Sequence, residues 1–394
     1  MRRIYVVGTA DTKGAELRFL ADTIREIGGE PVIVDVGIGR ATIEPGITAA
    51  EVASYGKPDL LLLKDRGQAV SAMAEAFSRF LVRREDIAGV IGIGGSGGAS
   101  IVTAGMRALP IGLPKLMVST LASGDTAPYV GVSDIVMMPS ITDLAGLNRI
   151  SRVILGQAAA ALTAMTKAPK PPEDDRPAIG LTMFGVTTKA VTQILERLGD
   201  SVEGMVFHAT GTGGRSMEAL VDSGYLTGVI DLTTTEVADL LCGGALPAGP
   251  DRLDCVARTK APYVGSVGAC DMVNFWAPDT IPARYADRHF HRHNSNVTLM
   301  RTNAAECDAI GKWIAAKLNR CEGPVHVLLP EAGLSALDIA GGVFFDPEAD
   351  EALFQALERG LRRAASRNIT RLPLHINDPA FADAVVAVYR HIIA

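Results

Sequence analysis

The sequence predicts an α/β protein of two doubly wound domains, each with a mostly parallel sheet, and a ligand cleft between the domains. Three observations support this prediction. Short aliphatic runs alternate with amphipathic helical segments along the 394 residues. A segment rich in proline and charge, residues 167–177, interrupts this alternation and is expected to be a linker. Glycine-rich turns follow several aliphatic runs, as expected where a strand leads into a helix.

The N-terminal domain is expected to span residues 1–170. Its aliphatic runs are continuous and do not alternate with polar residues, which is typical of parallel strands covered on both faces. Helices are expected at residues 14–27, 68–82, 99–107 and 153–166. The expected strands are residues 3–8, 31–36, 87–93, 115–119 and 133–138.

The same alternation starts again after the linker, and it predicts a C-terminal domain over residues 178–394. Its final segment, residues 378–392, is expected to form a helix that packs on one of the two domains. The expected strands are residues 179–184, 203–208, 227–230, 264–268, 325–329 and 371–375.

Composition restricts the class of protein. The net charge is −6 and the Lys and Arg residues form no cluster, so we expect no nucleic-acid partner. The five cysteines contain no C-x-x-C pair, which favours reduced thiols over a disulfide framework or a zinc site. The apolar segments are shorter than the roughly 20 residues that cross a bilayer. We therefore expect a cytoplasmic protein with no membrane partner.

Three glycine-rich turns are the strongest functional signal: GTADTKG at 8–14, GIGGSGG at 92–98 and GTGGRS at 211–216. Glycine lets successive backbone N–H groups converge on one anion at the start of a helix. The turns predict a phosphate-bearing small molecule, with Lys13 and Arg215 supplying positive charge. The predicted contacts are Gly8, Thr9, Lys13, Gly94, Gly95, Ser96, Gly97, Gly98, Gly211, Thr212, Gly213, Gly214 and Arg215.

The turn at 92–98 is open to other interpretations. It satisfies G-x-G-x-x-G, but residues 113–124 lack the acidic residue that a dinucleotide site needs for the ribose. It also satisfies G-x-S-x-G, in which Ser96 would be the nucleophile of a hydrolase. Since His208 is the first histidine of the chain, a triad would have to cross between domains. A phosphate-binding turn and a purely structural turn both remain open.

Further candidates lie outside these turns. Asp11, Asp125 and Glu236 are candidates for magnesium binding or for a catalytic base. Thr233 and Thr234 follow a predicted strand, and Arg301 stands between apolar residues, which indicates a fixed anionic partner from the protein or a ligand. On a strand, three histidines would share one face and could bind a metal, although nearby arginines oppose this. These are His289, His291 and His293.

Together with the three turns, several longer segments resemble the UPF0261 family, which includes the N-terminal region of the tomato resistance protein Tm-1. The resemblance covers essentially the whole chain. It implies two α/β subdomains, a homodimer and a capacity to bind ATP, and it implies no established reaction. The segments are SGDTAPYVG at 123–131, MFGVTT at 183–188, FHATGTGGRSME at 207–218, DLTTTE at 231–236, HNSNVTLMRT at 293–302 and LPEAGLSALDIAGGVFFDPEAD at 329–350.

The leading hypothesis is a cytosolic protein that binds ATP with magnesium between its domains. If it catalyses a reaction, the expected class is ATP-dependent activation of a small acidic metabolite. One alternative is a nucleotide-independent hydrolase or lyase that uses Ser96 or the three histidines. Another is a dimer that senses a ligand without catalysis. The substrate is not evident from the sequence.

Overall fold

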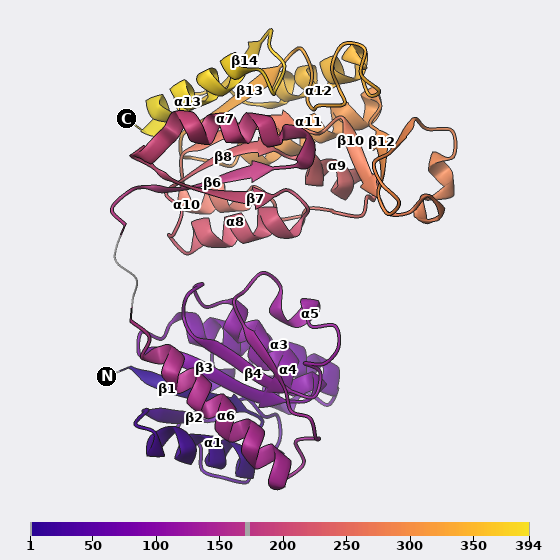
Figure 1. The fold of residues 1–394 in the computed structure, drawn as a ribbon. Coiled ribbons are helices and arrows are strands. Elements are labelled where there is room, and N and C mark those ends of the chain that lie inside the picture. Colours follow the sequence, from indigo (N-terminus) through magenta and orange to yellow (C-terminus); the bar gives the residue numbers. More distant parts are fainter. Residues whose placement is uncertain (1, 170–173, 394) are drawn as a thin grey trace. The chain divides into compact units, whose positions relative to one another are not determined.

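A computed structural model describes residues 2–169 and 174–393. The chain divides into two compact units, Met1–Pro172 and Glu173–Ala394, drawn in Figure 1. Residues 170–173 of the expected linker lie outside the described residues. Both units are α/β domains with parallel main sheets, as predicted. Among the described residues, no helix has the length and hydrophobicity of a membrane-spanning segment.

The sheet of the N-terminal domain has the order β2-β1-β3-β4-β5, and every neighbouring pair is parallel. The chain places β2 on one side of β1 and then crosses over to place β3, β4 and β5 on the other side. The direction in which strands are added therefore reverses between β1 and β3. The strands are β1 (Arg3–Gly8), β2 (Pro31–Asp35), β3 (Ile87–Gly94), β4 (Lys115–Ser119) and β5 (Val136–Pro139). The helices are α1 (Gly14–Glu26), α2 (Ala49–Ala53), α3 (Arg66–Val82), α4 (Ser96–Arg107), α5 (Ala127–Val130) and α6 (Arg149–Thr166), with a 3₁₀ turn, η1, at Leu60–Leu62.

Helices cover both faces of this sheet, as continuous aliphatic strands require. Alternate residues of β1 point to opposite faces. Tyr5 and Val7 pack into the core that includes Phe77 of α3, while Ile4 and Val6 pack into the core that α1 and α6 share. These residues of β1 are at most 2% exposed, so β1 is fixed at the centre of the domain.

The predicted boundary of one helix is wrong in a way that affects the site. The helix expected from residue 99 begins at Ser96, because the backbone turns directly after Gly94 and Gly95 provides the N-cap. Gly94 allows this turn, since a Cβ there would lie 2.9 Å from the Cα of Gly98. The last glycines of the motif therefore lie in the first helical turn.

The C-terminal domain repeats this topology with one more strand, in the order β14-β13-β9-β8-β6-β7. All its neighbouring strands are parallel. The strand predicted at 371–375 is displaced to Arg367–Leu372, because Pro373 cannot donate a ladder hydrogen bond. The other strands are β6 (Ala178–Met183), β7 (Glu203–His208), β8 (Gly228–Thr233), β9 (Tyr263–Gly268) and β13 (Val325–Pro330).

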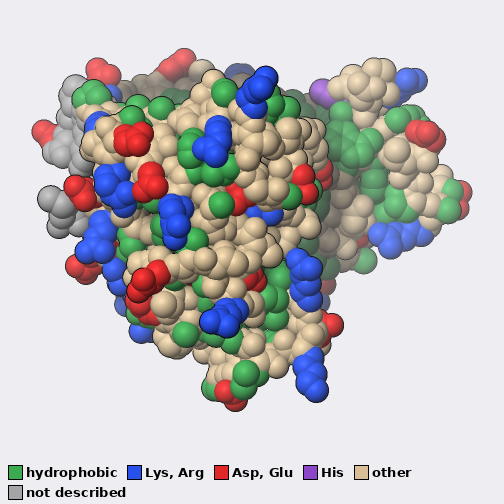
Figure 2. All heavy atoms as spheres, turned by 90° about the horizontal axis from the view of Figure 1, so that it is seen from below, with side chains coloured by type: hydrophobic (Ala, Val, Ile, Leu, Met, Phe, Trp, Pro, Cys, Tyr) green, Lys and Arg blue, Asp and Glu red, His purple; other side chains and the backbone are tan. Residues whose placement is uncertain are grey.

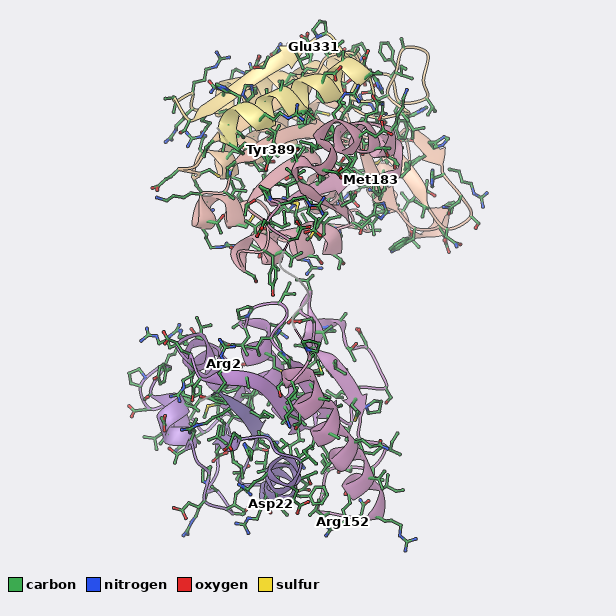
Figure 3. All side chains as sticks on the ribbon, turned by 60° about the vertical axis from the view of Figure 1, so that its left-hand side comes forward. Arg2, Asp22, Arg152, Met183, Glu331 and Tyr389 are labelled. Atoms are coloured by element: carbon green, nitrogen blue, oxygen red, sulfur yellow. The ribbon has the colours of Figure 1, made fainter. Side chains whose placement is uncertain are left out.

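Helices also cover both faces of the C-terminal sheet. The last helix packs against α7 in its own domain, and its Tyr389, labelled in Figure 3, lies against Gly228 of β8. A Cβ on Gly228 would lie 2.7 Å from the Tyr389 hydroxyl, so this close approach requires glycine. The helices are α7 (Thr188–Leu198), α8 (Thr212–Asp222), α9 (Thr235–Cys242), α10 (Asp254–Thr259), α11 (Ala304–Leu318), α12 (Pro347–Gly360) and α13 (Pro379–Ile393).

A second, antiparallel sheet in this domain was not predicted. Its order is β10-β12-β11, and its strands are β10 (Met272–Phe275), β12 (Thr298–Arg301) and β11 (Phe290–Arg292). In Figure 1, β10 and β12 lie at one side of the domain in orange.

On the face that Figure 2 shows, Lys and Arg side chains are interspersed with Asp and Glu.

Candidate functional site

A cavity of about 520 Å³ lies at the carboxyl ends of β1, β2 and β3. We call it the N-terminal pocket. It lies where the sheet order reverses between β1 and β3, which is where open α/β sheets bind ligands. The lining residues are Thr9, Asp11, Thr12, Lys13, Val36, Ile38, Gly39, Leu63, Lys64, Arg66, Val70, Gly94, Gly95, Ser96, Gly97, Gly98 and Ile101.

The start of α4 forms one wall of the pocket. Gly95 is the N-cap of this 12-residue helix, and it has no side chain to accept a bond from the first-turn amides. The N–H groups of Ser96, Gly97 and Gly98 have no acceptor within the helix, because they belong to its first turn. The positive end of the helix dipole is also located here, so this wall suits an anion.

Three cationic side chains also line the N-terminal pocket: Lys13, Lys64 and Arg66. Lys13 Nζ donates a hydrogen bond to the carbonyl of Leu144, a neutral group, so this contact leaves its charge uncompensated. Lys64 and Arg66 were missed in the sequence because their loop contains no glycine-rich turn. The sequence signal that could have indicated them is Asp65 between them, a typical N-cap residue, which marks the start of α3. Its carboxylate accepts a hydrogen bond from Gln68 N at 2.7 Å.

Two carboxylates shape the rim of the pocket. Asp35, missed in the sequence, is 2% exposed, and its Oδ1 accepts from the amides of Ala10 (2.9 Å) and Gly37 (2.7 Å). Burial raises the pKa of Asp35. Asp11 Oδ2 accepts from Gly39 N at 2.9 Å, whereas Asp11 Oδ1 is buried without a hydrogen-bond partner. Asp11 therefore has one oxygen fixed by a backbone amide and one buried oxygen that no donor satisfies.

Two of the predicted N-terminal residues lie outside the lining of this pocket. Gly8 is packed tightly, since a Cβ there would lie 3.0 Å from the Leu17 side chain. Asp125 is exposed, and its Oδ1 accepts from Ala127 N at 3.0 Å. Ser96 lines the pocket, but the first 207 residues contain no histidine to activate it.

The glycine-rich turn at 211–216 already holds an anion of the protein. Gly211 N donates to Glu236 Oε2 at 2.6 Å, and a Cβ on Gly214 would overlap Glu236 Oε1. The predicted free phosphate site at this turn is therefore filled by Glu236, so the structure does not support Glu236 as a free catalytic base. Thr212 and Arg215 are exposed, and Arg215 Nε donates to the carbonyl of Gly211 at 3.2 Å.

Glu236 belongs to a buried ionic network around Arg252, which is 1% exposed. The Arg252 guanidinium contacts Glu236 at 2.5 Å, Asp231 at 2.8 Å and Glu218 at 2.9 Å. Asp231 also accepts from Thr182 Oγ1 at 2.7 Å and Tyr263 Oη at 3.0 Å. These contacts show that the network is part of the packed interior.

Three other predicted ligand contacts of the C-terminal domain are also engaged internally. Thr233 Oγ1 lies 2.8 Å from Thr187 Oγ1, and Thr234 Oγ1 donates to the carbonyl of Ser266 at 3.2 Å. Arg301 is 5% exposed, and its fixed anionic partner is Asp350 at 2.7 Å. These side chains position loops at the carboxyl edge of the sheet.

The three clustered histidines do not form a shared metal site in the structure. Of the three, His291 alone lies within β11, because the strand begins at Phe290 and ends at Arg292. His289 and His291 both contact Phe344 edge-on, and His289 Nε2 forms a 2.9 Å hydrogen bond with the carbonyl of Val343. Over the described ranges, no three His, Cys, Asp or Glu side chains are arranged to hold a metal ion.

Comparisons with known proteins identify the family. The N-terminal domain model of the uncharacterised protein family UPF0261 matches residues 2–171, and the C-terminal domain model matches residues 176–393. The chain belongs to the UPF0261 family. The match covers both domains in the order in which the structure shows them.

Curated relatives occur in bacteria and in a plant. A UPF0261 protein of Rhizobium meliloti (strain 1021) is 63% identical over 100% of this chain and 99% of its own length. One of Clostridium tetani is 46% identical over 98% of this chain and 97% of its own length. The ToMV resistance protein Tm-1 of Solanum lycopersicum is 40% identical over 98% of this chain, which corresponds to 55% of the tomato protein.

Proposed function

We propose that this UPF0261 protein binds a nucleotide, ATP together with magnesium, in the N-terminal pocket. The observation that carries the proposal is the convergence of the first-turn amides of α4 with Lys13, Lys64 and Arg66 at the topological switch point. The volume of about 520 Å³ lies within the usual range for small-molecule pockets, roughly 300–1,000 Å³.

The polar and apolar parts of the pocket suit different parts of a nucleotide. The amides of residues 96–98 would bind phosphate oxygens, with Lys64 and Arg66 neutralising their charge. Val36, Ile38 and Val70 would contact the base and sugar, because they contribute aliphatic surface to the same cavity.

Asp11 is suited to hold the magnesium ion. Magnesium in nucleotide sites binds one or two carboxylates together with phosphate oxygens and water. Asp11 Oδ1 is buried beside the pocket without a hydrogen-bond donor, so a bound ion would satisfy it, while the bond from Gly39 N keeps the carboxylate in place. The same arrangement would serve ATP-dependent activation of a small acid, in which the ion compensates charge on the transferred group. We further propose a homodimer, as the family resemblance implies, and a cytoplasmic location, as the cysteine pattern and the short apolar segments indicate.

Isothermal titration with Mg-ATP tests the proposal. Replacing both Lys64 and Arg66 with Ala is expected to weaken binding roughly tenfold or more, because each cation forms a charge-assisted contact with phosphate. Arg215→Ala is the matched control, because Arg215 lies at the turn that Glu236 fills. This variant is expected to bind Mg-ATP as tightly as the natural protein. Absence of heat at millimolar Mg-ATP, or an equal loss in the Arg215 variant, would overturn the proposal.

The Asp11→Asn variant separates the contribution of magnesium to the binding affinity from the contribution of the nucleotide. The amide oxygen can still accept from Gly39 N, so the loop is expected to keep its conformation. The variant should bind ATP in EDTA as tightly as the natural protein and should lose the gain in affinity that magnesium provides. A magnesium effect that persists in the variant would exclude Asp11 as the ligand.

A further inference from the structure

Three buried carboxyl groups gather beside one arginine at the carboxyl edge of the C-terminal sheet. Asp271 lies between β9 and β10, Asp338 lies in the loop after β13, and Asp350 lies on α12. Asp271 and Asp338 are 0% exposed, while Asp350 and Arg301 are 5% exposed. We call these four residues the acid cluster.

Arg301 is the cation of the acid cluster. Its Nη2 lies 2.7 Å from Asp350 Oδ1 and 4.0 Å from Asp338 Oδ1. The remaining donors of the guanidinium bind carbonyls and a hydroxyl, including the carbonyl of Phe344 at 2.7 Å and Thr302 Oγ1 at 3.0 Å. One positive charge therefore faces three carboxyl groups.

Two oxygens of the acid cluster have no hydrogen-bond donor. Asp271 Oδ2 accepts from Ser335 Oγ at 2.8 Å and Asp338 Oδ2 accepts from Leu334 N at 2.8 Å, but Oδ1 of each is buried and unpartnered. A buried carboxylate oxygen without a donor is costly. Asp350 Oδ1 and Asp338 Oδ1 lie beside the same nitrogen of Arg301, so a proton on Asp350 is placed to supply the donor that Asp338 Oδ1 lacks.

Charge balance also indicates that the acid cluster holds a proton. Three ionised carboxylates and one guanidinium would leave two uncompensated negative charges in the interior, and buried groups take up protons to avoid this. Burial raises the pKa of Asp271 to about 7 and that of Asp350 to about 8, with the neighbouring Asp338 charge contributing in the same direction.

The acid cluster anchors residues 331–346, which we call the strap and which begin at Glu331 (labelled in Figure 3). Ser335 of the strap donates to Asp271, while the strap carbonyls of Phe344 and Asp346 accept from Arg301 at 2.7 and 3.1 Å. The strap also carries three largely exposed apolar side chains. These are Ile339 (45%), Val343 (42%) and Phe345 (45%).

We propose that the strap is held closed by a carboxyl proton shared within the acid cluster, and that loss of this proton releases the strap. The proton passes from the cluster to hydroxide or buffer, and no other bond changes. Once the proton is lost and all three carboxylates are ionised, their repulsion opposes the bonds that anchor residues 335, 344 and 346. Release would expose the apolar side chains of the strap more fully, in mildly alkaline solution.

Other groups around the acid cluster do not supply this proton. Burial raises the pKa of the Cys270 and Cys307 thiols, so both stay neutral over the relevant range. The His375 and His289 rings bond to the strap carbonyls of Ser335 and Val343, both at 2.9 Å, and neither forms a hydrogen bond with a carboxyl group of the acid cluster. Asp346 faces the N-terminus of α12, where its Oδ1 accepts from Ala349 N at 3.1 Å.

Hydrogen exchange read by mass spectrometry tests the proposal on the full chain. Between pH 6 and 9, the protection factors of residues 331–346, corrected for intrinsic exchange, are expected to fall by up to roughly tenfold per pH unit, the limit for release of one proton. Asp350→Asn imitates the protonated carboxyl, because its amide can accept from Arg301 and donate to Asp338. Its strap should stay protected at all these pH values.

Glu348→Gln is the matched control, because Glu348 is exposed on the same helix and should leave the pH dependence unchanged. Infrared spectroscopy of the natural protein and of Asp350→Asn provides a second measurement. Because Asp239 outside the acid cluster also has its pKa raised by burial to about 7, a protonated carboxyl band at pH 7 that disappears by pH 9 and is smaller in the variant is expected. Its absence at pH 7, or a pH dependence in Asp350→Asn equal to that of the natural protein, would overturn the proposal.

Discussion

Arg252 shows how one residue organises the interior of the C-terminal domain. Its guanidinium joins β8, α8 and α9 by pairing with carboxylates on each of them. The sequence does not reveal this role, because a single arginine between two aspartates resembles a solvent-exposed charge. Its partners lie 16, 21 and 34 residues away along the chain.

Arg252→Met is expected to lower the free energy of unfolding by about 3–5 kcal/mol, because it leaves three buried carboxylates without their cation. Arg258→Met is the control, since its ion pair with Asp222 is about half exposed and contributes about 0–1 kcal/mol. Urea denaturation followed by circular dichroism measures both. Equal losses in the two variants would show that burial does not determine the contribution of Arg252.

The junction between β3 and α4 shows how an element creates the N-terminal pocket. The strand ends at Gly94 and the helix begins two residues later, so there is no room for a loop that would cover the helix N-terminus. Each glycine of the motif contributes differently. Gly94 allows the close approach to Gly98, whereas a Cβ on Gly97 would touch only the Val70 side chain, at 3.9 Å.

Gly94→Ala is therefore expected to destabilise the protein by about 1–3 kcal/mol, as overpacking typically does. Gly97→Ala should be neutral or stabilise by up to about 1 kcal/mol, because Ala favours the helix and its Cβ makes only an ordinary van der Waals contact with Val70. Chemical denaturation of both variants measures the difference. If Gly97→Ala were as destabilising as Gly94→Ala, the close contact at Gly94 would not be the cause.

The sequence predicts most parallel strands, because buried strands such as β1 and β3 are continuous aliphatic runs. It does not reveal the second sheet, whose strands have only three or four residues and of which β10 and β11 are separated by a long segment without strands. The sequence reveals the turn at 92–98, because several glycines directly after an aliphatic run form a pattern that is visible within a few residues. Lys64 and Arg66 were missed because they enter the same pocket through tertiary packing, which leaves no local pattern.

Across the whole molecule, buried carboxyls determine how stability depends on pH. Asp239, Asp271 and Asp350 have pKa values raised by burial to about 7, 7 and 8. Each binds a proton more tightly in the folded state, so its stabilisation is complete below the unfolded pKa of about 4 and is lost as the pH rises through the folded pKa. The C-terminal domain should therefore weaken from pH 5 to pH 8.

The expected slope is up to about 1.4 kcal/mol per pH unit for each carboxyl. Urea denaturation at several pH values measures it, and Asp350→Asn should reduce the slope by the contribution of one group. Carboxyls with lowered pKa, such as Glu351 beside Arg371, act in the opposite direction, but only below about pH 4.5. Stability that rises between pH 5 and pH 8 would contradict the prediction.

The turn at 211–216 has a consequence for how the two domains respond to their surroundings. Glu236 is an intramolecular ligand, and its local concentration is fixed by the fold and does not depend on the solution. A free anion would have to displace a tethered competitor that is also bonded to Arg252. The C-terminal turn therefore keeps Glu236 as its own anion while the domain is folded, so of the glycine-rich turns in the described residues, those at the N-terminal pocket suit the proposed phosphate ligand.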